Sequence, residues 1–153
     1  MAADIKLEGG TRSIVINDDA ALANNARAAG DYQNDTTLEL FCTAYLQVQY
    51  DGGPPAVGAE IARLYVLPGD DDASEVFPDG GDAGLGTDDT PQQVFYVGSF
   101  ESVNPSTTVN EVLGIPGISL TPGNNRFVLL NVSGQSLDST WELRIKPYHL
   151  QSV

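Results

Sequence analysis

The sequence predicts an all-β protein, folded as a single antiparallel β-sandwich of the jelly-roll type with an N-terminal arm. The chain has 153 residues, which is the size of one domain. Its apolar residues recur mainly with a period of two, in short runs bounded by turns rich in Gly, Pro, Asn and Asp. No long helix is indicated, and counting the alternating runs gives about seven or eight strands.

The longest alternating run is residues 38–50, LELFCTAYLQVQY. Its even positions are all apolar or aromatic and its odd positions are mostly polar, so one long strand would present them on opposite faces. We expect the even face to be the spine of the core. The odd face also carries Phe41 and Tyr45, which plain exposure to water does not favour.

Residues 1–30 are predicted to form an arm or a short helix in front of a sandwich domain at residues 31–153. Two short β-prone runs, at 4–7 and 12–16, lie on either side of a Gly-Gly pair. The alanine-rich run that follows ends at Gly30. It is expected to be either a helix packed on the domain or an arm that becomes ordered only against a partner.

The rest of the chain supplies shorter strands separated by strong turn signals. In the last of them, Trp141, Leu143 and Ile145 are expected to face inward. The segment 114–120 is extended but interrupted by glycine and proline, which suits the edge of a sheet. The strands are predicted at residues 60–67, 93–100, 107–113, 126–131 and 140–148.

Residues 68–91 are predicted to form a long acidic loop, with eight acidic residues and no basic one. The loop exceeds the about 12 to 15 residues that are usual for a structureless loop, which suggests a functional or partner-facing role. Clustered carboxylates such as Asp70 and Asp72 are the oxygen ligands that calcium prefers, but the spacing is not that of an EF-hand. A solvated acidic loop is the simpler interpretation, and no metal or other cofactor is expected.

Charge and composition exclude several function classes. The chain has 7 Lys and Arg against 21 Asp and Glu, a formal net charge of −14, so no nucleic-acid or membrane partner is expected. Cys42 is the only cysteine and is expected to be inert in the core, while the only histidine, His149, is expected at the surface. Neither a nucleophile motif nor a phosphate-binding glycine loop occurs, so the protein is not expected to be an enzyme and has no candidate catalytic residue.

The N-terminal sequence has neither the basic region nor the apolar core of a secretory signal, and no apolar run of about 18 residues occurs. The protein is therefore expected to be made in the cytoplasm without secretion, and to remain there or leave as part of an assembly.

Residues 23–29 and then 31–38 lead directly into the long alternating strand. A second group of segments lies near the C-terminus, at residues 115–123, 126–137 and 143–148. These two parts of the sequence resemble small virion structural proteins of tailed bacteriophages. Together they cover about half of the chain, and the acidic loop is outside the resemblance.

The resemblance implies a capsid decoration or cement protein, located in the virion, that binds the outside of the phage head as an oligomer, often a homotrimer. Its partners would then be the major capsid protein and copies of itself. The candidate contact residues are apolar or aromatic side chains of the arm and of the odd face of the long strand, namely Ile5, Leu7, Ile14, Ile16, Phe41 and Tyr45.

A carbohydrate-binding module on the head or tail, used for attachment to a host surface, is the alternative function. Sugar-binding modules stack aromatic rings against sugar rings, and Tyr45 and Tyr96 are the residues whose replacement would test it.

Overall fold

The computed structural model describes residues 5–17, 19–34, 39–69 and 95–152. At residues 5–7 and 150–152 the description is of the backbone alone. The predicted acidic loop therefore lies outside the described residues, except for Pro68 and Gly69. No helix in the described ranges is long and apolar enough to cross a membrane.

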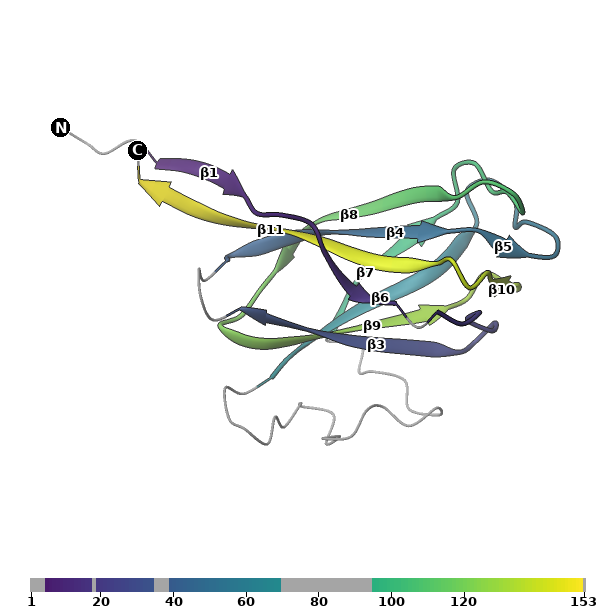
Figure 1. Ribbon diagram of the computed structural model, residues 1–153, viewed down its shortest axis with the longest axis horizontal. Coiled ribbons are helices and arrows are strands. Elements are labelled where there is room, and N and C mark those ends of the chain that lie inside the picture. The colour runs from purple at the N-terminus through teal and green to yellow at the C-terminus, as the bar shows by residue number, and fades with distance from the viewer. Residues whose placement is uncertain (1–4, 18, 35–38, 70–94, 153) are drawn as a thin grey trace.

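Two antiparallel sheets pack face to face, so the predicted all-β sandwich is confirmed (Figure 1). The first sheet consists of β1 (Ile5–Gly9), β2 (Ser13–Ile16), β11 (Glu142–Ser152), β4 (Phe41–Val48) and β8 (Glu111–Ser119), in the order β1-β11-β4-β8 with β2 also on β11. The second consists of β3 (Arg27–Asn34), β9 (Gly123–Asn131), β6 (Glu60–Pro68) and β7 (Tyr96–Glu101), in the order β3-β9-β6-β7. Two short strands, β5 (Tyr50–Asp51) and β10 (Ser136–Leu137), pair at one end.

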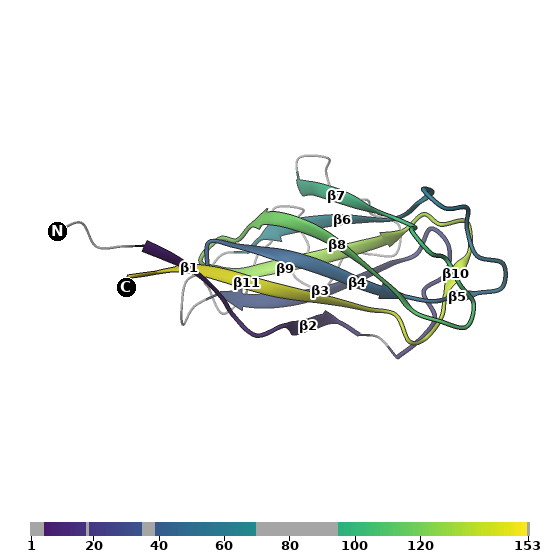
Figure 2. The same ribbon diagram turned by 90° about the horizontal axis from the view of Figure 1, so that it is seen from above.

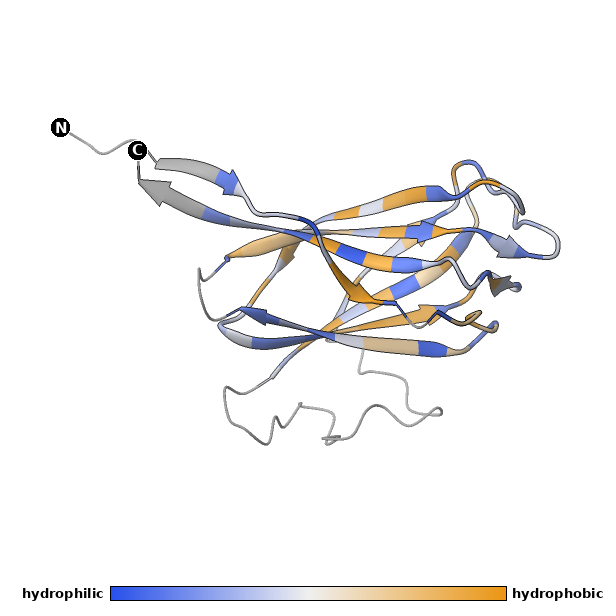
Figure 3. Ribbon diagram, viewed as in Figure 1, coloured by the Kyte–Doolittle hydropathy of each residue, from blue (hydrophilic) through white to orange (hydrophobic). Residues whose placement is uncertain are grey.

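The long alternating run is β4, and its even face is the spine of the core as predicted. Cys42, Ala44, Leu46 and Val48 are all 0% exposed, whereas every odd position of β4 is partly exposed. The strand is shorter than expected: Leu40 is 48% exposed, and the chain resumes after Gln49 as the separate strand β5. Figure 3 shows the alternation of hydrophilic and hydrophobic residues along β4 and along its neighbour β11.

The core also contains the inward residues predicted for the last strand. Trp141, Leu143 and Ile145 are at most 1% exposed, and the indole Nε1 of Trp141 donates a hydrogen bond of 2.9 Å to the carbonyl oxygen of Ala20. A second apolar cluster, which the sequence did not indicate, lies on the outer face of the second sheet. Its buried members are Tyr65, Leu67, Val128 and Leu130.

The alanine-rich run does not form the helix considered from the sequence. The chain turns at Asn25, whose φ is +63°, and continues as β3, so residues 30 and 31 lie in the middle of one strand. The run pairs with β9 along the whole of β3, from Arg27 opposite Leu130 to Asn34 opposite Gly123. β2 also approaches it closely, because a Cβ at Gly30 would lie 1.9 Å from the carbonyl oxygen of Val15. Small residues are needed here for packing between strands, and packing overrides the helical preference of alanine.

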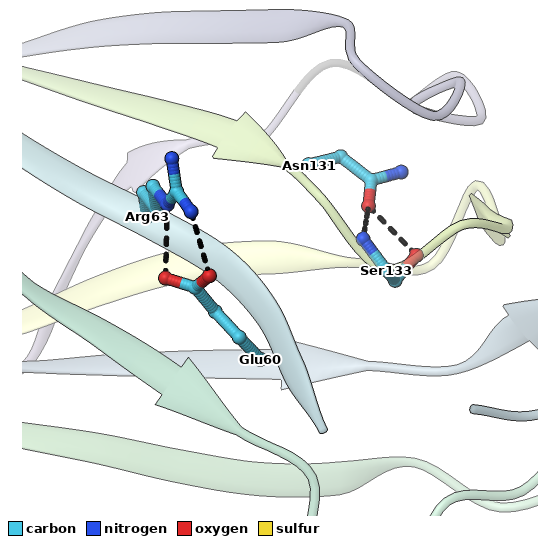
Figure 4. Close-up of polar contacts among 4 residues, drawn as sticks. All are labelled: Glu60, Arg63, Asn131 and Ser133. Carbon is cyan, nitrogen blue, oxygen red and sulfur yellow. Dashed lines mark hydrogen bonds and ion pairs between the residues drawn. The ribbon is translucent and has the colours of Figure 1, made fainter. Parts of the chain in front are cut away.

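Buried asparagine side chains fix several turns. The Oδ1 of Asn131 accepts hydrogen bonds from the N–H and the Oγ of Ser133, at 3.0 and 2.8 Å (Figure 4). Its Nδ2 donates to the carbonyl oxygens of Leu22 and Gln135. Because both ends of the amide are used, Asn131 ties the β9–β10 turn to the segment before β3.

An exposed ion pair lies on the second sheet, within β6. Figure 4 also shows Arg63 and Glu60 of β6, joined by hydrogen bonds of 2.9 and 2.8 Å. Both side chains are substantially exposed, at 45% and 35%, so this ion pair contributes little to stability.

Candidate interaction surface

The outer face of the first sheet gathers aromatic, basic and apolar residues from three strands. Arg144, Lys146 and Tyr148 of β11 pair with Tyr45, Thr43 and Phe41 of β4, and Ile14 of β2 pairs with Arg144 on the other side. Directly paired residues of an antiparallel sheet present their side chains on the same face. We call the set Arg12, Ile14, Phe41, Tyr45, Arg144, Lys146 and Tyr148 the aromatic-basic face.

Cations and rings contact one another across this face. The guanidinium carbon of Arg12 lies 4.3 Å from the ring centroid of Tyr45, and Lys146 Nζ lies 5.6 Å from that of Tyr148. The rings of Phe41 and Tyr148 stack with centroids 5.5 Å apart. At exposed sites each cation–π contact contributes about 0.5–1 kcal/mol, so these contacts orient the side chains but do not hold the fold together.

The charge of this face is opposite to that of the chain as a whole. It carries Arg12, Arg144 and Lys146, three of the seven basic residues of a chain whose formal net charge is −14. The strands β4 and β11 together contain one acidic residue, Glu142, which forms an ion pair with Arg144. The aromatic-basic face is therefore suited to an acidic or polar partner surface.

Three of the six predicted contact residues come together on this face. Ile14 is 53% exposed, and Phe41 and Tyr45 are partly exposed beside it. Ile16, by contrast, is 3% exposed and packs in the main core, so it is a core residue and not a surface contact. A period of two would place Ile14 and Ile16 on the same face of β2, but a register shift in the pairing with β11 lies between them and breaks that alternation.

The remaining two contact residues, Ile5 and Leu7, lie in β1, which pairs with the end of β11 beyond the sandwich body. The pairing runs from Gly9 opposite Tyr148 to Ile5 opposite Ser152. Figures 1 and 2 both show this two-stranded ribbon extending away from the rest of the molecule. In this register Leu7 and Ile5 lie two and four positions along β1 from Gly9, so the ribbon continues the sheet that bears the aromatic-basic face.

Glu111 is the most elaborately bound carboxylate in the described part of the chain, and its role is structural. Its Oε1 accepts hydrogen bonds from the hydroxyls of Tyr50 and Ser102, and its Oε2 accepts them from the backbone N–H groups of Val103 and Asn104. Burial alone would raise the pKa of Glu111, but these hydrogen bonds outweigh burial and lower it. A charged, fully bonded carboxylate has no proton to donate, so it fixes the β7–β8 loop and is no acid catalyst.

Cys42 lies in the core, where burial raises the pKa of its thiol to about 12. Since the thiolate is the reactive form, we expect Cys42 in the folded protein to resist a thiol reagent such as Ellman's reagent at pH 8. Addition of denaturant should release one thiol per chain. Rapid labelling of the native protein would show that the core around Cys42 opens easily.

Two further observations on the described residues concern metal ligands and grooves. The residues described contain no group of three His, Cys, Asp or Glu side chains placed to hold a metal ion. A groove of about 340 Å³ lies between β6, β7 and β8, lined by residues such as Val66, Phe95, Val97, Pro116 and Thr121. None of its described lining residues is titratable, so the groove offers no group for acid–base catalysis.

The aromatic residues considered for sugar binding do not form one platform. Tyr45 belongs to the first sheet and Tyr96 to the second. One face of the Tyr45 ring is covered by Arg12, and Tyr96 meets Tyr65 edge to face with centroids 5.7 Å apart. Both rings are thus engaged within the protein.

No family model matches the chain, and neither a curated protein nor a solved structure matches it.

The sequence did not indicate Arg12 or Tyr148 as parts of this surface. The outward positions of Arg144 and Lys146 could be read from the alternation of the last strand, but their neighbours could not. Strand order and register decide that β11 lies beside β4, and neither is encoded in a local pattern.

Proposed function

We propose that the protein is a non-enzymatic virion structural protein, a capsid decoration or cement protein that binds the outside of a tailed-phage head. The observation that carries the proposal is the aromatic-basic face together with the ribbon that extends it. The resemblance of the N-terminal and C-terminal segments to virion structural proteins supplies the identity of the target.

The composition of the aromatic-basic face is that of a protein contact. Interfaces are enriched in Tyr, Phe and Arg, and their energy is concentrated in a few such anchors. Phe41, Tyr45 and Tyr148 provide the apolar area, and Arg12 and Arg144 provide charge complementarity to a partner that bears carboxylates. The net negative charge of the chain opposes non-specific contact between copies.

The proposed partners are the major capsid protein and other copies of this chain, with the homotrimer that the resemblance implies remaining a prediction. Location in the virion follows from the same proposal. No nucleic-acid or membrane partner is proposed, because the charge of −14 is unfavourable for both.

We also assign the sandwich to the jelly-roll class. If β1 and β2 are taken as one edge strand, the chain's first strand pairs with its last, and β3 pairs with β9 in the other sheet. This strand order, with Greek-key connections between two four-strand layers, supports the assignment. Jelly rolls occur in capsid proteins and in lectins, so the class by itself does not decide between the two functions.

The double variant Phe41→Asp with Tyr45→Asp tests the proposed surface. We expect it to remain folded, because both side chains are only partly buried, and to lose binding to heads, because it replaces two aromatic anchors with charges of the same sign as the chain. Binding is measured by cosedimentation of the full-length protein with purified heads that lack it, and folding by circular dichroism.

A matched control places the same charges on the opposite side of the molecule. Ala29 and Gln33 are exposed residues of β3, in the second sheet, and Ala29→Asp with Gln33→Asp should leave cosedimentation unchanged. Equal loss in both double variants, or no cosedimentation of the wild type, would contradict the proposal. Binding to a glycan array that Tyr45→Ala abolishes would instead favour the carbohydrate-binding alternative.

A further inference from the structure

The outer edge of β1 is open as far as the described residues show. Among the described residues, β1 pairs with β11 on one side and with no strand on the other. Its pairing partners run from Tyr148 to Ser152. Tyr148 lies opposite Phe41, the first residue of β4, and the other four partners lie beyond the end of β4. An unpaired edge presents a row of backbone N–H and C=O groups that can pair with another strand.

The ribbon that carries this edge extends away from the sandwich body (Figures 1 and 2). A two-stranded ribbon is only marginally stable in water without a further strand or a packed face. The chain nevertheless continues its pairing in register through five residue pairs, from Gly9–Tyr148 to Ile5–Ser152. A third strand on the open edge would supply the missing support.

The sequence of β1 is complementary to itself in one antiparallel register. The strand reads IKLEG, and pairing two copies about Leu7 places Lys6 opposite Glu8 of the other copy, twice. Pairing about Lys6 would place like charges opposite each other, and so would pairing about Glu8. A shift by one residue would put apolar residues opposite charged ones.

We propose that two copies of this chain associate through their β1 strands, antiparallel and centred on Leu7. The contact is isologous, with the two-fold axis passing between the two Leu7 residues. It joins the first sheets of both copies into one continuous sheet, in which each β1 lies between β11 of its own chain and β1 of the other. The two aromatic-basic faces then belong to one sheet, which doubles the surface available to a partner.

Charge reversals on β1 test the register directly. Glu8→Lys puts lysine opposite lysine twice, and Lys6→Glu puts glutamate opposite glutamate twice, so either homodimer should have a Kd at least about tenfold higher than the wild type. In an equimolar mixture, Glu8→Lys carries lysine at positions 6 and 8, and Lys6→Glu carries glutamate at positions 6 and 8. The mixed dimer therefore has two opposite-charge pairs and should form again. Sedimentation velocity over a concentration series at about 0.15 M salt, where repulsion between the acidic bodies is screened, measures the Kd.

Two further variants complete the design. The double swap Lys6→Glu with Glu8→Lys restores both opposite-charge pairs and should dimerise like the wild type. Glu101→Lys changes the net charge as much as Glu8→Lys does, but at an exposed position at the end of β7, and should leave the Kd unchanged. Hydrogen exchange of the backbone amides of residues 5–9 should slow as the wild-type concentration rises, and should not do so in Glu8→Lys.

Three results would overturn the proposal. These are a wild type that stays monomeric at every concentration, an oligomer whose Kd is the same in Glu8→Lys and Lys6→Glu as in the wild type, and a mixture of these variants that associates no better than either alone. The self-association is independent of what the aromatic-basic face binds, so its failure would leave the proposed function standing, and loss of head binding would leave the dimer standing.

Discussion

Replacement of Gly30 by alanine should lower the free energy of unfolding by about 3 kcal/mol, at the upper end of what overpacking usually costs. The added Cβ would lie 1.9 Å from the carbonyl oxygen and 2.8 Å from the carbonyl carbon of Val15. Both obstacles are backbone atoms next to Ile16 in β2, so no side chain can rotate to relieve the contact. β2 would have to move off β3, and Ile16 would leave the core with it.

The control for this prediction is Gly53→Ala. No atom lies within 4 Å of a Cβ at Gly53, and its backbone is not in the left-handed region, so the change should stay within about 0.5 kcal/mol. Urea unfolding followed by tryptophan fluorescence compares the two variants. Equal stabilities of Gly30→Ala and Gly53→Ala would show that β2 is not held against β3.

Replacement of Glu111 by glutamine should cost about 2–3 kcal/mol at neutral pH, although the two side chains have nearly the same shape. Each carboxylate oxygen of Glu111 accepts two hydrogen bonds, at 2.7 and 3.0 Å on Oε1 and at 3.0 and 2.9 Å on Oε2. In glutamine the amide oxygen can still accept from the two backbone N–H groups, but the amide nitrogen cannot accept from the hydroxyls of Tyr50 and Ser102. Those two hydroxyls would have to turn round and accept instead, and all four hydrogen bonds to a charged oxygen would be lost. The exposed Glu101→Gln is the matched control and should be near neutral.

The lowered pKa of Glu111 gives this prediction a pH dependence. The stability that the carboxylate contributes is fully present above its ordinary pKa of 4.5 and is lost as the pH falls through the lower pKa of the folded state. The difference in unfolding free energy between wild type and Glu111→Gln should therefore shrink as the pH falls below about 4. A difference that stays constant between neutral pH and about pH 3 would contradict the assignment of a charged Glu111.

The faces of the main strands could be predicted from the sequence because a period of two is a local property. The even positions of β4 and the inward positions of β11 are all buried, as their alternation indicated. In β6, which the sequence predicted as a strand at residues 60–67, the alternating residues Ala62, Leu64 and Val66 also lie in the main core. The alternation could not show that Tyr65 on the opposite face is buried as well, since that burial depends on what covers the sheet.

The features that the sequence did not predict depend on contacts between distant segments. The alanine-rich run is a strand because it pairs with β9, about a hundred residues further along the chain, and β2 of the other sheet packs closely on its Gly30. The aromatic-basic face combines Arg12 with Tyr45, which only the pairing of β2 and β4 with β11 brings together. Its candidate residues Phe41 and Tyr45 could be noticed as aromatics among polar neighbours, but their cationic partners could not.

The ribbon formed by β1 and β11 has a mechanical consequence. Ile5 pairs with Ser152, so tension applied to both ends of the chain would act across the ladder and open its hydrogen bonds one after another. Tension applied along β1 alone would load all of its hydrogen bonds to β11 together, in shear. A copy tethered through β1 would therefore withstand a larger force before detaching than a copy pulled by its two ends.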